Sequence, residues 1–165
     1  MLVERVGLRG LLIIEINGVE VERVHNLITD VGDQFYGDRA AAIGAIDTVT
    51  GMRLGTGVTV PSKTGAGAAI VTYESGSALA IDGGFPTSTQ PGGAGTARVI
   101  TWQTSWGAGV VDGVALAEVV ITNETPLTDS AGSAADTISR ALIGPYTLNP
   151  ADTIAVTWSH SLLGA

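Results

Sequence analysis

The stretch LLIIEINGVEVERV, residues 11–24, decides the fold of this chain. Asn17-Gly18 stands between two apolar runs and is a strong hairpin signal, because a type I′ turn needs a positive φ at both central positions. The pairs that such a turn aligns are Ile16 with Val19, Glu15 with Glu20 and Ile14 with Val21. The stretch therefore predicts an N-terminal β-hairpin.

Strand alternation gives the two faces of this hairpin different chemistry. The apolar face is expected to carry Ile14, Ile16, Val19 and Val21, whereas the opposite face carries Ile13 with Glu15, Glu20 and Glu22. Like charges directly opposite each other are destabilising. The three glutamates are therefore either a solvated face or a candidate interface, which would contact an arginine of a neighbouring subunit or weakly bind a divalent cation. Glycosidase-like use of the carboxylates is disfavoured, since no cleft with aromatic platforms is evident.

A helix is expected after the hairpin, over residues 29–45. Thr29 or Asn26 can cap its N-terminus, and Asp30 and Asp33 suit the positive end of the helix dipole. Phe35 continues an apolar stripe at helical spacing and is expected to be buried.

The remaining chain has the pattern of short strands separated by turns. The expected strands are 52–57, 68–73, 78–81, 98–106, 114–122, 136–142 and 153–160. Trp102, Trp106 and Trp158 lie in phase with aliphatic residues and are predicted to be core. The pattern predicts an all-β protein, a jelly-roll-like β-sandwich with an N-terminal hairpin and one short helix. We expect residues 11–165 to form a single domain and residues 1–10 to form an arm.

Composition excludes several classes of function. The 165 residues carry net charge −8, which disfavours nucleic-acid binding, and no run of about 18 apolar residues predicts a membrane span. Cysteine is absent, so no disulfide, thiol nucleophile or zinc-thiolate site can form. Only 15% of residues are charged and 23 are glycine, which favours a surface covered by neighbouring subunits over that of a free monomer.

Catalytic and cofactor motifs are incomplete. Residues 57–64 end in Ser62-Lys63-Thr64 but lack the second glycine of a phosphate-binding loop, and Pro61 removes a backbone donor. His25 and His160 are each expected at a strand end, and two histidines do not form a metal site. Since no Gly-x-Ser-x-Gly elbow is present either, we predict no enzyme activity, no cofactor and no metal.

Four stretches carry a resemblance to a known class of domain. They are HNLITDVG (25–32), MRLGTGVTVPSKT (52–64), VALAEVVIT (114–122) and YTLNPADTIAVTW (146–158). Their order resembles that of a small β-rich domain of virion proteins in tailed bacteriophages. The resemblance implies a structural role, as a capsid decoration (cement) protein or a tail component, and implies no catalytic residues.

The expected function is that of a capsid decoration protein on the capsid exterior, with the major capsid protein and further copies of itself as partners. The apolar residues of the expected arm, Leu2, Val3, Val6 and Leu8, join the three glutamates as the candidate interface. A tail, neck or fibre component with a host-binding role is the alternative, and a small β-sandwich hydrolase is the third possibility. Exposed aromatic side chains in a groove would favour the tail, neck or fibre component. Turnover of an ester or glycoside substrate would favour the hydrolase.

Overall fold

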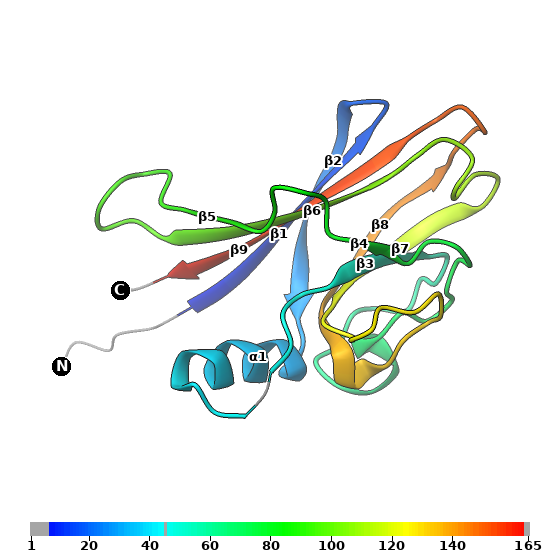
Figure 1. The fold of residues 1–165 in the computed structure, drawn as a ribbon. Helices are drawn as coiled ribbons and strands as arrows, with labels where there is room; N and C mark the ends of the chain where they lie inside the picture. The colour runs from blue at the N-terminus through cyan, green and yellow to red at the C-terminus, as the bar shows by residue number, and fades with distance from the viewer. Residues whose placement is uncertain (1–6, 45, 164–165) are drawn as a thin grey trace.

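The computed structural model describes residues 7–44 and 46–163 (Figure 1). In chain order the elements are β1 (Gly7–Ile16), β2 (Val19–Ile28), α1 (Asp30–Ala41), β3 (Gly51–Gly55), the 3₁₀ turn η1 (Gly65–Ala68), β4 (Leu79–Ala80), β5 (Thr87–Thr89), β6 (Arg98–Trp106), β7 (Ala115–Thr122), η2 (Ala134–Asp136), β8 (Thr137–Thr147) and β9 (Ile154–Leu163). The chain is therefore all-β with an N-terminal hairpin and one short α-helix, as predicted.

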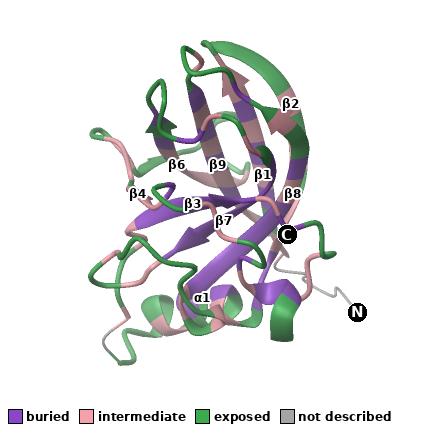
Figure 2. Cartoon of the chain, turned by 90° about the vertical axis from the view of Figure 1, so that its right-hand side faces the viewer, coloured by how far each residue is buried: buried purple, intermediate pink, exposed green. Residues whose placement is uncertain are grey.

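The nine strands form one antiparallel sheet in the order β4-β3-β7-β8-β2-β1-β9-β6-β5. Strand β2 joins its two halves, because its first part pairs with β1 whereas Leu27 and Ile28 at its end pair with β8. The sheet curls so that the halves face each other across the buried core, as the two layers of a sandwich do (Figure 2). This curled half-barrel does not confirm the jelly-roll arrangement.

The Asn17-Gly18 turn is confirmed, with φ of 51° and 75°. Glu15 pairs with Glu20 as expected, but Ile14 pairs with Glu22 and not with Val21. A β-bulge causes this difference, since the extra residue on β2 shifts the register between Ile14 and Glu15. The expected apolar face is therefore wrong beyond the first pair: Ile14 is buried, whereas Val21 is exposed.

The helix begins as predicted and ends earlier. Thr29 caps it, its hydroxyl oxygen accepting a hydrogen bond from the Gly32 amide at 3.0 Å. The helix ends at Ala41 and not at residue 45, because Ala42 adopts the left-handed conformation and its N–H turns back to the Arg39 carbonyl. Phe35 is buried, as predicted.

Several strand predictions differ from the structure, and one of these strands, β8, runs on to Thr147 and not only to residue 142. Residues 68–73 form no strand, because the amides of Val71 and Thr72 donate to a buried carboxylate, that of Glu118. Strand β5 lies where no strand was predicted, and it pairs with β6. Strand β9 runs on to Leu163, so His160 lies within a strand and not at its end.

The core lies between the two halves of the sheet and contains all three tryptophans, as predicted. Ile154, Val156 and Trp158 point into it from alternate positions of β9. The part of the expected arm that the structure describes, Gly7–Gly10, is the first part of β1 and pairs with β9. Leu8 lies there opposite Leu162, and the other apolar arm residues, Leu2, Val3 and Val6, lie outside the described residues.

Candidate functional site

The three glutamates of the hairpin do not converge on one site. Glu20 accepts two hydrogen bonds from Arg23, both at 3.0 Å, and these lower the pKa of its carboxyl group. The bulge turns Glu22 to the other face, where it accepts hydrogen bonds from the Tyr146 hydroxyl and the Gly144 amide, both at 2.9 Å. Burial and this bond to Glu22 raise the pKa of Tyr146 to about 12. Within residues 7–44 and 46–163, no group of three acidic or histidine side chains can hold a metal ion.

A fully buried ion pair lies in the other half of the sheet and is called here the charged cluster. Glu118 of β7 and Arg140 of β8 are both inaccessible to solvent. The carboxylate accepts from Arg140 Nε at 3.0 Å and from Nη2 at 2.7 Å. Because an isolated buried charge is strongly unfavourable, each of these side chains requires the other.

The charged cluster also binds the backbone of residues 56–72, called here the valine loop. Glu118 accepts hydrogen bonds from three loop amides, those of Gly57 at 3.0 Å, Val71 at 3.0 Å and Thr72 at 2.7 Å. Arg140 Nη1 donates to the carbonyl oxygens of two loop residues, Thr59 at 2.8 Å and Gly67 at 3.3 Å. A loop with little regular structure is thereby fastened to the centre of the sheet.

Glycine is required where the loop passes the carboxylate. A Cβ at Gly57 would lie 2.4 Å from Glu118 Oε1, inside any normal contact distance. A side chain at position 57 would therefore displace the loop from the ion pair.

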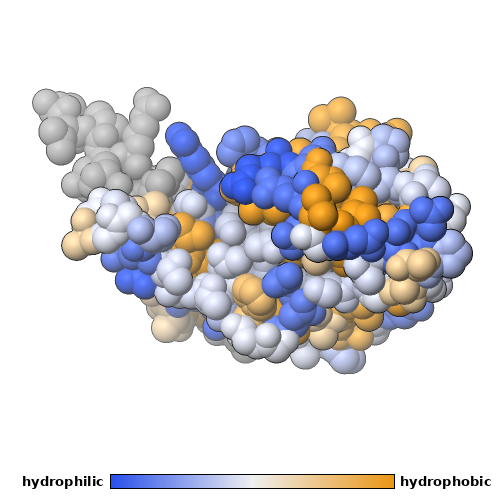
Figure 3. Space-filling model, turned by 90° about the horizontal axis from the view of Figure 1, so that it is seen from above, coloured by the Kyte–Doolittle hydropathy of each residue, from blue (hydrophilic) through white to orange (hydrophobic). Residues whose placement is uncertain are grey.

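Apolar side chains point outward from the valine loop. Val58, Val60 and Val71 have relative exposures of 74%, 75% and 41%. Exposed apolar side chains on a fastened backbone suit a surface that binds another protein. Other exposed valines lie outside this loop, among them Val19 at the tip of the β1–β2 hairpin. Seen from above, hydrophobic and hydrophilic patches lie side by side on the surface (Figure 3).

A second candidate site, called here the aromatic pocket, opens between α1 and the strands β6 and β9. Its volume is about 540 Å³. Phe35 and Tyr36 of α1 and Trp102 of β6 supply its aromatic walls, and Ile100 and Leu162 add aliphatic surface. Its size and lining are those of small-molecule sites in proteins.

Behind the pocket wall lies a neutral cluster, formed by Tyr36, Trp158 and His160. His160 is fully buried, and burial lowers its pKa to about 3, so the ring is neutral. The Trp158 indole N–H donates to Nε2 at 3.1 Å, so Nε2 is the acceptor nitrogen. The proton of the neutral ring therefore lies on Nδ1, which donates to the Tyr36 hydroxyl oxygen at 2.6 Å.

The other residues considered from the sequence have structural contacts. Lys63 forms ion pairs with Asp33 and, at 3.8 Å, with Asp30, so its ammonium group lies against the helix and does not close a phosphate-binding loop. His25 lies within β2, its Nδ1 3.2 Å from the Gly10 carbonyl oxygen. Leu8 and His25 line a separate pocket of about 480 Å³.

Neither cluster was predicted from the sequence. A single acidic residue inside the apolar run of β7, matched by a single basic residue in β8, is the signal that identifies a buried ion pair. For the neutral cluster the signal was the strict alternation of β9, which places His160 in phase with Trp158.

No family model, curated protein or solved structure matches this chain. In the part of the chain that the structure describes, no helix has the length and apolar character needed to cross a membrane.

Proposed function

We propose that this chain is a structural protein of a tailed-phage virion, a non-catalytic capsid decoration protein that attaches to the major capsid protein on the capsid exterior. The observation that supports this proposal is the valine loop, with its exposed valines and with a backbone bound by the charged cluster. The choice of the major capsid protein as partner rests on the resemblance of the four sequence stretches described above to domains of phage virion proteins.

A fastened loop favours binding because little conformational entropy remains to be lost at the interface. Each copy that binds only the assembled shell adds its binding free energy to the stability of that shell. Several modest interfaces per copy, including contacts between neighbouring copies, would reinforce one another through multivalency. The net charge of −8 disfavours contact with packaged DNA and is consistent with a position outside the shell.

The two other candidate functions have less support. A tail, neck or fibre module that binds a host glycan would use exposed aromatic platforms, whereas Trp102, Trp106 and Trp158 are all buried. A hydrolase would need a general base with partners that activate it, whereas His160 has no exposed surface and the hydrogen-bond contact of His25 is to the Gly10 backbone carbonyl.

Binding to purified capsids that lack the protein tests the role of the valine loop. Val58→Asp and Val60→Asp place a charge on the proposed contact surface, and each is expected to weaken capsid binding by about tenfold or more, equal to about 1.4 kcal/mol. Val19→Asp is the matched control, because Val19 is similarly exposed but lies on the hairpin. Co-sedimentation that is equal for all three variants and the unmodified chain would contradict the proposed docking surface.

A further inference from the structure

The aromatic pocket has the features of a ligand-binding site, whether or not the chain is a virion protein. Its walls come from α1, the connection from α1 to β3, the strands β6 and β9, and Pro86 in the connection between β4 and β5. Phe35 and Trp102 form closed sides of the pocket and are themselves nearly inaccessible. The pocket is sizeable and mainly apolar. Transfer of an apolar group of matching size from water into the pocket is therefore favourable.

The neutral cluster fixes the inner wall of this pocket. The His160 ring lies 5.4 Å from the Trp102 ring and 5.7 Å from the Tyr36 ring, measured between centroids. Because Nδ1 of His160 donates to Tyr36, the hydroxyl hydrogen of Tyr36 remains available for an acceptor. The neutral cluster thus holds Tyr36, a residue of the pocket wall, in place.

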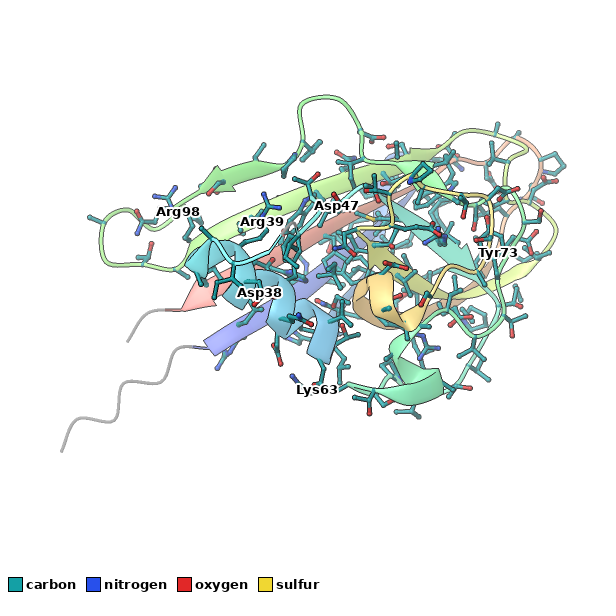
Figure 4. The ribbon with its side chains drawn as sticks, turned by 60° about the horizontal axis from the view of Figure 1, so that its bottom comes forward. Asp38, Arg39, Asp47, Lys63, Tyr73 and Arg98 are labelled. Carbon is teal, nitrogen blue, oxygen red and sulfur yellow. The ribbon has the colours of Figure 1, made fainter. Side chains whose placement is uncertain are left out.

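One arginine, Arg39, is among the residues that line the pocket, and a second, Arg98, lies beside the lining residue Leu162. The guanidinium carbon of Arg39 lies 5.5 Å from the centre of the Phe35 ring. Arg98 pairs with Leu162 across β6 and β9, so it shares the sheet face of the pocket residues Ile100 and Leu162. Figure 4 shows both arginines at the same end of the molecule. Within the described residues, neither guanidinium forms an ion pair.

Acidic groups near the mouth limit the positive charge there. Asp38 accepts a hydrogen bond from Gln34 Nε2 at 3.0 Å, but this uncharged donor does not remove the repulsion between the carboxylate and an anion. Asp47 lies near Arg39 and is exposed (Figure 4). An anionic group at Arg39 would meet attraction from its guanidinium and repulsion from the carboxylates of Asp38 and Asp47.

We propose that the aromatic pocket binds an aliphatic carboxylate of the fatty-acid class. The hydrocarbon chain lies among Phe35, Trp102 and Leu162, and the carboxylate lies at the mouth, between Arg39 and Arg98. A guanidinium presents paired N–H donors that match a carboxylate, so the two arginines select the charged head group, while the pocket selects the chain.

Titration of the full chain with dodecanoate tests this proposal, followed by calorimetry and by the fluorescence of Trp102 and its neighbours. We expect saturable binding, with dodecanol and dodecyltrimethylammonium binding at least about tenfold more weakly, because they lack the anionic head group. Equal affinity for dodecanol would contradict the role of the arginines. The absence of saturable dodecanoate binding would overturn the proposal.

Four variants divide the site into its parts. Arg39→Ala and Arg98→Ala should each weaken dodecanoate binding by about fivefold to tenfold, whereas Asp47→Asn should strengthen it. Val49→Trp fills the pocket and should abolish binding without changing any charge. Arg9→Ala is the matched control, since it removes an exposed positive charge outside this pocket. An Arg9→Ala loss equal to that of Arg39→Ala would contradict a specific site, provided circular dichroism shows that all the variants fold.

Discussion

The two halves of the curled sheet each bury a polar cluster, but by opposite means. Around β7 and β8, Glu118 and Arg140 are ionised partners that also bind backbone groups of the valine loop. Around β9, the cluster of Tyr36, Trp158 and His160 is neutral, and its hydrogen bonds join only side chains. The comparison shows that a buried charge pair can organise a long loop, whereas a neutral cluster fixes the wall of a pocket.

Removing one partner of the charged cluster should have the largest effect. Arg140→Ala leaves the Glu118 carboxylate buried without its counter-ion and should cost about 3–5 kcal/mol of unfolding free energy. Chemical denaturation monitored by tryptophan fluorescence measures this difference. Arg9→Ala removes an exposed arginine and should change the stability by less than about 0.5 kcal/mol. Equal effects of the two substitutions would show that the buried pair has no special role.

Acidification should weaken the neutral cluster. The unfolded chain binds a proton at His160 below about pH 6.5, whereas the folded chain does so only near pH 3. The contribution of the neutral His160 to the unfolding free energy is therefore fully present above pH 6.5. It is lost as the pH falls below this value, because the unfolded chain then binds more protons than the folded chain. For one such histidine, the unfolding free energy is expected to fall by about 2 kcal/mol between about pH 6.5 and 4.5.

The control for this pH dependence is His160→Gln, which has no titratable ring. Its unfolding free energy should fall less steeply over the same pH interval. The difference in slope should correspond to about one proton fewer taken up on unfolding per molecule. Asp129 and Asp152 have lowered pKa values, because of hydrogen bonds from Tyr73 and Asn17 respectively, and they contribute chiefly at lower pH. Identical slopes for the variant and the unmodified chain would contradict a buried neutral His160.

The smallest effect is expected from Tyr36→Phe. This change removes the acceptor of the His160 Nδ1 proton and keeps the aromatic ring, so we expect a loss of about 1–2 kcal/mol. The same variant should leave the valine loop unaffected, since Tyr36 lies in the other cluster. Hydrogen exchange at the Val71 and Thr72 amides measures that independence, and faster exchange at these amides would show that the two clusters are coupled.

Local patterns in the sequence predicted most of the fold. Asn17-Gly18 and Thr29 determine a turn and a helix cap through contacts within a few residues, so both were predictable. The bulge at Val21 was not, because it depends on the pairing of whole strands. Residues 68–73 have the pattern of a strand, but a side chain 46 residues away accepts the amide hydrogen of Thr72.

The candidate sites were harder to predict, for the same reason. The three glutamates of the hairpin were predicted to share a face, and one bulge separates Glu22 from Glu20. The charged cluster joins residues 22 positions apart to loop residues far earlier in the chain. The aromatic pocket depends on how α1 lies against β6 and β9, which strand and helix periodicity do not specify.

We proposed above that this chain decorates a phage capsid, and counting its copies in purified virions of a phage whose genome carries this sequence is the sharpest test of that proposal. Quantitative gel analysis against the major capsid protein gives the number, and labelling with a specific antibody gives the position. A decoration protein should be present in hundreds of copies over the capsid exterior. A handful of copies confined to the tail, or none in the particle, would contradict the account.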